Sequence, residues 1–226
     1  MKIDSLSRWP YFGPAMDLSQ KPPMPARNPG WTGAFLHAWD GLVWTTAYQR
    51  NMKFHVLAAV LVGLVGSGIP LGLPEKVTLV FCVMLVFFSE VINSALEALV
   101  DLHTERYHDL AKVAKDTAAA GVLVLSIGTF VLFAVVLVND WPIVMGHPQE
   151  VMRQLLVGAP MAAIGATLPW NKPRPRVVDA LAFFGALALW VATGSWTASP
   201  VFSAMIASLL VLQGAAAYEL RWRTKR

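Results

Sequence analysis

Charged residues are scarce in this chain, and their scarcity excludes a soluble globular domain. Only 14% of the 226 residues are Asp, Glu, Lys or Arg, whereas 56% are hydrophobic, and the mean hydropathy is +0.53. Soluble domains carry about 25% charged residues. The composition therefore indicates an integral membrane protein, in which each crossing needs about 20 apolar residues. Several crossings with short connections would fill a chain of this length.

The chain also lacks the residues that several common sites require. Its single cysteine, Cys82, excludes an internal disulfide and a cysteine metal site, and we expect it to be a small buried residue. No spacing of the five histidines suggests a zinc site. There is no Gly-rich phosphate loop, which excludes the P-loop class. Membrane topology explains the net charge of +4, so we expect no nucleic-acid partner.

Six apolar segments are long enough, or nearly long enough, to cross a membrane. They comprise residues 54–73, 77–100, 117–138, 151–168, 178–194 and 200–218. The connections at 102–116 and 171–176 and the last six residues are basic, whereas the alternate connections are poor in Lys and Arg. Since Lys and Arg accumulate on the cytoplasmic side, we expect both termini in the cytoplasm. Tryptophans at the ends of these segments, such as Trp170, are typical of the membrane interface.

The region before the first apolar segment has two parts. Residues 1–30 are polar and Pro-rich, and they predict a cytosolic tail. Further along, apolar side chains recur at helical intervals: Phe35, Leu36, Trp39, Leu42, Val43 and Ala47. This pattern predicts an amphipathic helix on the cytoplasmic membrane surface. We therefore predict an all-α polytopic membrane protein with one N-terminal surface helix and about six transmembrane helices.

A polar stripe lies in the second apolar segment. Glu90, Asn93, Glu97 and Asp101 follow at spacings of 3, 4 and 4 residues, so they share one face of a helix. Glu90 would lie about 20 Å along this segment, within reach of water from the cytoplasm. Such residues at membrane depth indicate function, although polar contacts between helices are the simpler alternative. They suit either chemistry on a lipid head group or a cation or proton pathway.

Two motifs carry a resemblance to a known family. E-V-I-N-S-A-L-E-A-L-V-D begins at Glu90, and Y-H-D-L-A-K-V-A-K-D begins at Tyr107. Together they closely resemble the signature of the prokaryotic diacylglycerol kinase family, small membrane enzymes that use ATP to phosphorylate lipid alcohols. The resemblance extends from about Phe35 through the third apolar segment, including A-W-D-G-L and Q-R-N-M-K-F-H. The second motif is more similar to the undecaprenol kinase branch than to the branch acting on diacylglycerol.

The resemblance implies a role for each matching residue. Glu90 would be the general base that takes the proton from the lipid hydroxyl, and Asn93 would orient the reacting groups. Glu97 would bind Mg²⁺, which bridges the phosphates of ATP. Asp101 completes the stripe without an assigned role. The nucleotide-binding residues implied by the resemblance are Lys115, Asp116, Tyr107, His108 and Lys112.

One position departs from the family pattern. Where the family has a second metal-binding glutamate in the surface helix, this chain has Gln49. An amide can offer its carbonyl oxygen to Mg²⁺ but brings no negative charge, so we expect weaker metal binding. Two interpretations stay open: an enzyme with altered metal or substrate demands, or a family member that has lost catalysis and serves as a lipid-binding or transport protein.

The sequence therefore predicts ATP-dependent phosphorylation of undecaprenol or diacylglycerol at the cytoplasmic face of the bacterial inner membrane. Residues 31–141 would form a three-span kinase module with its surface helix, and residues 142–226 a further three-span region without an assigned role. The resemblance implies Mg²⁺ as cofactor, ATP as cosubstrate and a homotrimer in the bilayer. A transporter is the competing class. The chain shows no inverted repeat or broken helices, and the Lys115–Asp116 pair stands in a matching context, which argues against transport.

Overall fold

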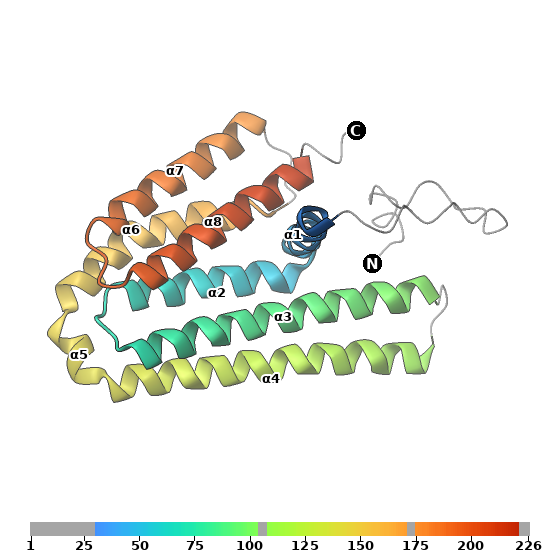
Figure 1. Cartoon of the computed structure of the whole chain (residues 1–226), viewed down its shortest axis with the longest axis horizontal. Coiled ribbons are helices and arrows are strands. Elements are labelled where there is room, and N and C mark those ends of the chain that lie inside the picture. Colours follow the sequence, from blue (N-terminus) through green and yellow to red (C-terminus); the bar gives the residue numbers. More distant parts are fainter. Residues whose placement is uncertain (1–29, 104–107, 171–174, 222–226) are drawn as a thin grey trace.

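The computed structural model describes residues 30–103, 108–170 and 175–221, and all regular structure in these ranges is helical. The helices are α1 (Gly30–Tyr48), α2 (Arg50–Ser67), α3 (Leu73–His103), α4 (Asp109–Asn139), α5 (Trp141–Gly146), α6 (Pro148–Thr167), α7 (Arg176–Gly194) and α8 (Pro200–Arg221). In Figure 1 the helices α2, α3, α4, α6, α7 and α8 run side by side, and the short α5 turns the chain at one end of the bundle. The predicted all-α fold is confirmed.

Within the described ranges, four helices are long and apolar enough to cross a membrane: α3, α4, α7 and α8. The remaining two long bundle helices, α2 and α6, are less apolar. For α2 the packing gives the reason, since it contacts α1, α3, α6 and α8 and so faces protein on most sides. A helix shielded in this way needs fewer apolar residues than one that faces lipid. The count of six spans stays a prediction.

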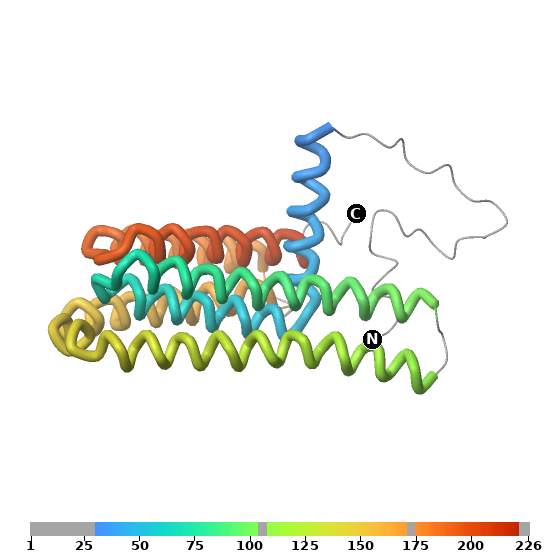
Figure 2. The backbone as a smooth tube through the Cα atoms, turned by 60° about the horizontal axis from the view of Figure 1, so that its bottom comes forward, coloured from blue at the N-terminus to red at the C-terminus, as the bar shows by residue number. Residues whose placement is uncertain are grey.

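Helices α3 and α4 are the longest elements, and they pack along each other. Each has 31 residues, so each is about 46 Å long, whereas the hydrocarbon core of a bilayer is about 30 Å thick. Figure 2 shows that their connected ends reach beyond the rest of the bundle, past the point where α1 crosses it at a steep angle. These ends are therefore long enough to leave the apolar layer.

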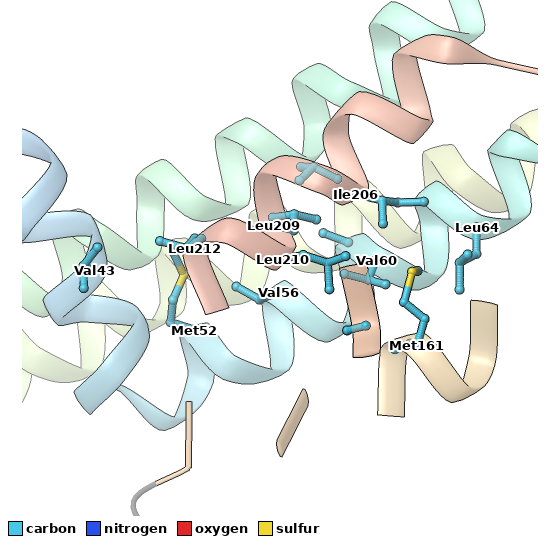
Figure 3. Close-up of a cluster of buried hydrophobic side chains, with 14 residues drawn as sticks. Val43, Met52, Val56, Val60, Leu64, Met161, Ile206, Leu209, Leu210 and Leu212 are labelled. Atoms are coloured by element: carbon cyan, nitrogen blue, oxygen red, sulfur yellow. The ribbon is translucent and has the colours of Figure 1, made fainter. Parts of the chain in front are cut away.

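The main hydrophobic core joins the N-terminal helices to the C-terminal ones (Figure 3). Its buried members include Val56 and Leu64 of α2, Met161 of α6, and Ile206 and Leu210 of α8. The regions 31–141 and 142–226, predicted as two parts, thus pack as one body. Their boundary itself stays a prediction.

Candidate active site

The polar stripe of α3 lies on the face that also carries core residues. Glu90 is 1% exposed and Asn93 is 3% exposed, while Glu97 and Asp101 are half-buried. About two turns before Glu90, the same face of the helix presents Val83, which belongs to the main core. The same face of α3 thus changes from apolar to polar toward the C-terminal end of the helix.

Two buried oxygen atoms of the stripe have no hydrogen-bond partner among the described residues. They are Glu90 Oε2 and Asn93 Oδ1. The amide Nδ2 of Asn93 donates to Glu97 Oε1 at 3.3 Å, which orients the Asn93 side chain along the stripe. The Ser94 hydroxyl donates to the backbone carbonyl of Glu90 at 2.7 Å, so it does not satisfy the carboxylate. Leaving buried polar atoms without partners costs free energy, so a ligand that bonded to these two oxygens would recover part of that cost.

An ion pair joins the end of the stripe to α4. Lys115 Nζ lies 2.5 Å from Asp101 Oδ1, and the two side chains are 34% and 26% exposed. The pair brings a cation from the second motif to the carboxylates of the first. The structure therefore gives Asp101 a partner that the sequence analysis did not assign.

The connection between α1 and α2 places Gln49 differently from the sequence prediction. We expected this residue inside the surface helix, but α1 ends at Tyr48, and Gln49 precedes α2 with an extended backbone of φ −87° and ψ 123°. Its backbone N–H donates to Thr45 O at 2.9 Å. Its side-chain Nε2 is buried and has no hydrogen-bond partner among the described residues. Gln49 therefore lies at a corner that two helices fix, next to a helix, α1, that contacts α3.

Comparison with known proteins gives a consistent picture. Residues 36–137 match the family model described as prokaryotic diacylglycerol kinase. An undecaprenol kinase of Bacillus subtilis is 37% identical over 94 residues, which cover 42% of this chain and 76% of that protein. The chain belongs to the prokaryotic diacylglycerol kinase family. A diacylglycerol kinase of Synechocystis is 36% identical over 115 residues, covering 48% of this chain and 66% of that protein. One from Escherichia coli is 30% identical over 101 residues, covering 45% and 83%.

The part that matches the family has clear bounds. The family model ends at residue 137, so α5 to α8 lie outside it. No solved structure matches the chain. The predicted family is thus confirmed, while the predicted roles of single residues stay predictions.

The other residues of the second kinase motif lie at the start of α4. His108 caps this helix, because its Nδ1 accepts a hydrogen bond from the backbone N–H of Leu110 at 3.2 Å. Lys112 and Asp116 form an exposed pair at 3.9 Å, which contributes little to stability and leaves both side chains accessible. Tyr107 lies outside the described residues. The first two turns of α4 thus combine the positive end of the helix dipole with two lysines, of which Lys115 contacts the stripe at Asp101, and this arrangement suits phosphate groups.

The donor set fits a nucleotide-bound Mg²⁺ better than a permanent metal. Among the described residues, no three His, Cys, Asp or Glu side chains are grouped so that they could hold an ion by themselves. Mg²⁺ bound to ATP needs only one or two protein carboxylates, because phosphates and waters complete its shell. Glu97 offers one such carboxylate, and the unpartnered Asn93 Oδ1 offers a neutral amide oxygen from the same helix face.

A cavity of about 150 Å³ lies between α2, α3 and α4, on the N-terminal side of the stripe along α3. Its α3 wall includes Val86 and Phe87, the turn that precedes Glu90. Its polar residues are His55, Ser126 and Thr129. His55 ends the quoted stretch Q-R-N-M-K-F-H, but neither it nor the other two residues had an assigned role, because no sequence pattern shows that these two helices border one cavity. The cavity offers an apolar space beside the buried carboxylate.

Proposed function

We propose that this chain transfers the γ-phosphate of ATP to the hydroxyl group of a membrane lipid at the cytoplasmic surface of the inner membrane. The observation that carries this proposal is the buried Glu90 carboxylate, which shares one helix face with Asn93 and Glu97. Lys115 joins this face from α4. The relatives named undecaprenol kinase and diacylglycerol kinase support the same conclusion.

Glu90 acts as the general base in this proposal. Its unpartnered Oε2 is suited to accept the proton of a lipid hydroxyl as the oxygen attacks phosphorus. The proton moves to the carboxylate, the new O–P bond forms, and the bond between the γ-phosphorus and the bridging oxygen breaks, with ADP as the leaving group. Asn93 Oδ1 provides an acceptor that can orient the lipid head group or the metal.

The nucleotide binds between the stripe and the start of α4. Lys115 and Lys112 balance phosphate charge, while His108 and Asp116 border the nucleotide. Glu97, together with the neutral Gln49, would hold the Mg²⁺ of the nucleotide, which when bound would supply neutralisation of the charge that develops on the phosphates. The protein otherwise contributes by positioning the two substrates for in-line transfer.

The acceptor lipid enters sideways from the bilayer. The cavity between α2, α3 and α4 borders the turn of α3 that precedes Glu90, so a hydrocarbon chain lying there would present its hydroxyl end to the carboxylate. Undecaprenol and diacylglycerol are the two candidate acceptors.

Gln49 supports a second candidate function. Without the charge of a second glutamate, metal binding is weaker, and a chain that has lost catalysis would act as a lipid-binding or transport protein. Substitution of this residue separates the two functions.

The test is Mg²⁺-dependent transfer of labelled γ-phosphate from ATP to diacylglycerol and to undecaprenol in detergent micelles. We expect transfer by the wild type and a loss of about 10² to 10⁴ in rate for Glu90→Gln, because a general base contributes about this factor. Glu75→Gln is the matched control at the opposite end of α3. Its rate of phosphate transfer should equal that of the wild type. Gln49→Glu should lower the Mg²⁺ concentration that is needed.

Each contrary result has a definite meaning. Transfer at the wild-type rate by Glu90→Gln would contradict the role of the base. Absence of transfer in the wild type together with transfer by Gln49→Glu would show a silenced enzyme. No transfer by any variant would favour lipid binding or transport.

A further inference from the structure

The corner that carries Gln49 is held by helices that lie outside the family match. On one side, Ala47 (1% exposed) and the adjacent Tyr48 pack against Ala216 (0% exposed) and Leu220 (6% exposed) of α8. Two small alanines in this contact allow the helices to approach closely. The end of α1 is therefore fixed by α8.

The first turn of α2 is held from a second side. Lys53 Nζ lies 5.1 Å from the centre of the Trp170 ring, a distance at which a cation is attracted to the ring face. The Phe54 ring lies 6.1 Å from the Trp170 ring at an interplanar angle of 77°, an edge-to-face contact. Trp170 follows the end of α6. The corner thus lies between contacts from α8 and from the end of α6.

Arg221 connects these two supports. Its Nε lies 2.7 Å from Asp179 Oδ2 of α7. Its Nη1 donates to Leu168 O at 3.2 Å, and its Nη2 donates to Trp170 O at 2.9 Å. Arg221 and Asp179 are each only 7% exposed, and the two hydrogen bonds from the charged guanidinium to the carbonyl groups are of the strong, charge-assisted kind. We call Arg221, Asp179 and the two carbonyl groups the Arg221 network.

We propose that Arg221 is a positioning residue for the metal-binding corner of the kinase site. The Arg221 network fixes the segment that carries Trp170 against the end of α8 that carries Leu220, and these two residues hold the helix turns on either side of Gln49. The helices α6 to α8 thus brace the catalytic half of the chain. This inference rests on the proposed function only in assigning Gln49 to Mg²⁺.

The kinetic test compares Arg221→Met with a matched control at the other end of the same helices. Gln154 is 1% exposed, and its Nε2 donates to Thr193 O at 3.2 Å, which joins α6 to α7 far from the corner. We expect Arg221→Met to raise the KM for Mg²⁺–ATP by about fivefold to tenfold. Gln154→Leu should leave this KM unchanged, even if it lowers thermal stability. Activity that falls in both variants only in proportion to the folded fraction would reduce Arg221 to a structural role.

A second measurement does not depend on activity. Thr46 is 0% exposed, and its hydroxyl donates to Leu42 O of its own helix at 2.9 Å. Thr46→Cys in a Cys82→Ala background should react slowly with maleimide in purified protein. Adding Arg221→Met should raise the labelling rate severalfold, whereas adding Gln154→Leu should not. An unchanged rate with Arg221→Met would overturn the proposal.

The two tests separate the proposal from the function on which it rests. If the wild type transfers no phosphate, the proposed function fails, but the labelling rates still decide whether Arg221 holds the corner. Arg221→Lys serves if Arg221→Met does not fold, since lysine keeps the charge toward Asp179 but cannot reach both carbonyl groups. Like Arg221→Met, Arg221→Lys should raise both the KM for Mg²⁺–ATP and the labelling rate of Thr46→Cys.

Discussion

At the scale of single residues, the candidate site depends on buried polar atoms that a substrate can satisfy. An unpartnered buried acceptor such as Glu90 Oε2 costs about 1 to 3 kcal/mol. A core without function would replace it with an apolar side chain of similar size. The burial of Glu90 and Asn93 is therefore better explained by a role in function than by a contribution to stability.

Lys115 should contribute more to nucleotide binding than its neighbour Lys112. The ion pair with Asp101 holds Lys115 at the end of the stripe, whereas Lys112 is 62% exposed in its side chain. We predict that Lys115→Met raises the KM for ATP about tenfold, as expected for a contact worth about 1.4 kcal/mol. Lys112→Met, the matched control, should change it by a smaller factor. Steady-state kinetics at fixed Mg²⁺ would show this, and equal effects would contradict a special position for Lys115.

The sequence alone predicted the polar stripe of α3, but it did not predict the ion pair between Asp101 and Lys115. The spacing of Glu90, Asn93, Glu97 and Asp101 follows from helix periodicity alone, and membrane depth made the residues conspicuous. The contact between Asp101 and Lys115 depends on how two antiparallel helices align across their connection. No local pattern specifies that alignment.

At the scale of elements, α2 is the helix that packs against both the N-terminal and the C-terminal half of the chain. The sequence predicted a span at residues 54–73, and the structure has α2 end at Ser67. Gly66 is the reason why α8 can approach so closely, since a Cβ added there would lie 2.6 Å from Cε2 of Phe202. Phe202 is 0% exposed and has little room to move.

A methyl group at Gly66 should therefore destabilise the bundle. We predict that Gly66→Ala lowers the free energy of unfolding by about 1 to 3 kcal/mol, the usual cost of overpacking a core. Gly128→Ala on α4 is the matched control, because nothing lies within 4 Å of its added Cβ. It should be neutral or slightly stabilising. Thermal unfolding in detergent would measure both, and a neutral Gly66→Ala would mean that α2 and α8 are less closely packed.

At the scale of the whole molecule, the sequence predicted the class of fold but not the arrangement of the helices. Apolar segments can be recognised one at a time, yet their periodicity does not say which of them become neighbours. Arg221 was counted among basic residues at a cytoplasmic end, and Trp170 as an interfacial aromatic. Asp179, a carboxylate in an apolar helix, was the available signal for a buried partner.

The orientation of the molecule in the membrane follows from its basic connections. We propose that the connected ends of α3 and α4 face the cytoplasm, because the basic connections gather there. In a Cys82→Ala background, exposed positions at the two ends serve as reporters: His103→Cys at the end of α3 and Met145→Cys in α5. An impermeant maleimide should label Met145→Cys in intact cells and His103→Cys only in inverted membranes. The opposite pattern would place the site on the side without ATP.

The contact between α8 and the corner has a consequence for biosynthesis. The ribosome completes residue 49 long before residue 221, and at about 5 to 20 residues per second the interval is roughly 10 to 30 seconds. During that interval the helices with the carboxylates are already in the bilayer, while the Arg221 network does not yet exist. A nascent chain would therefore hold its catalytic helices without the support that α6 to α8 give to Gln49, and its KM for Mg²⁺–ATP would fall to the mature value only after the last helix has inserted.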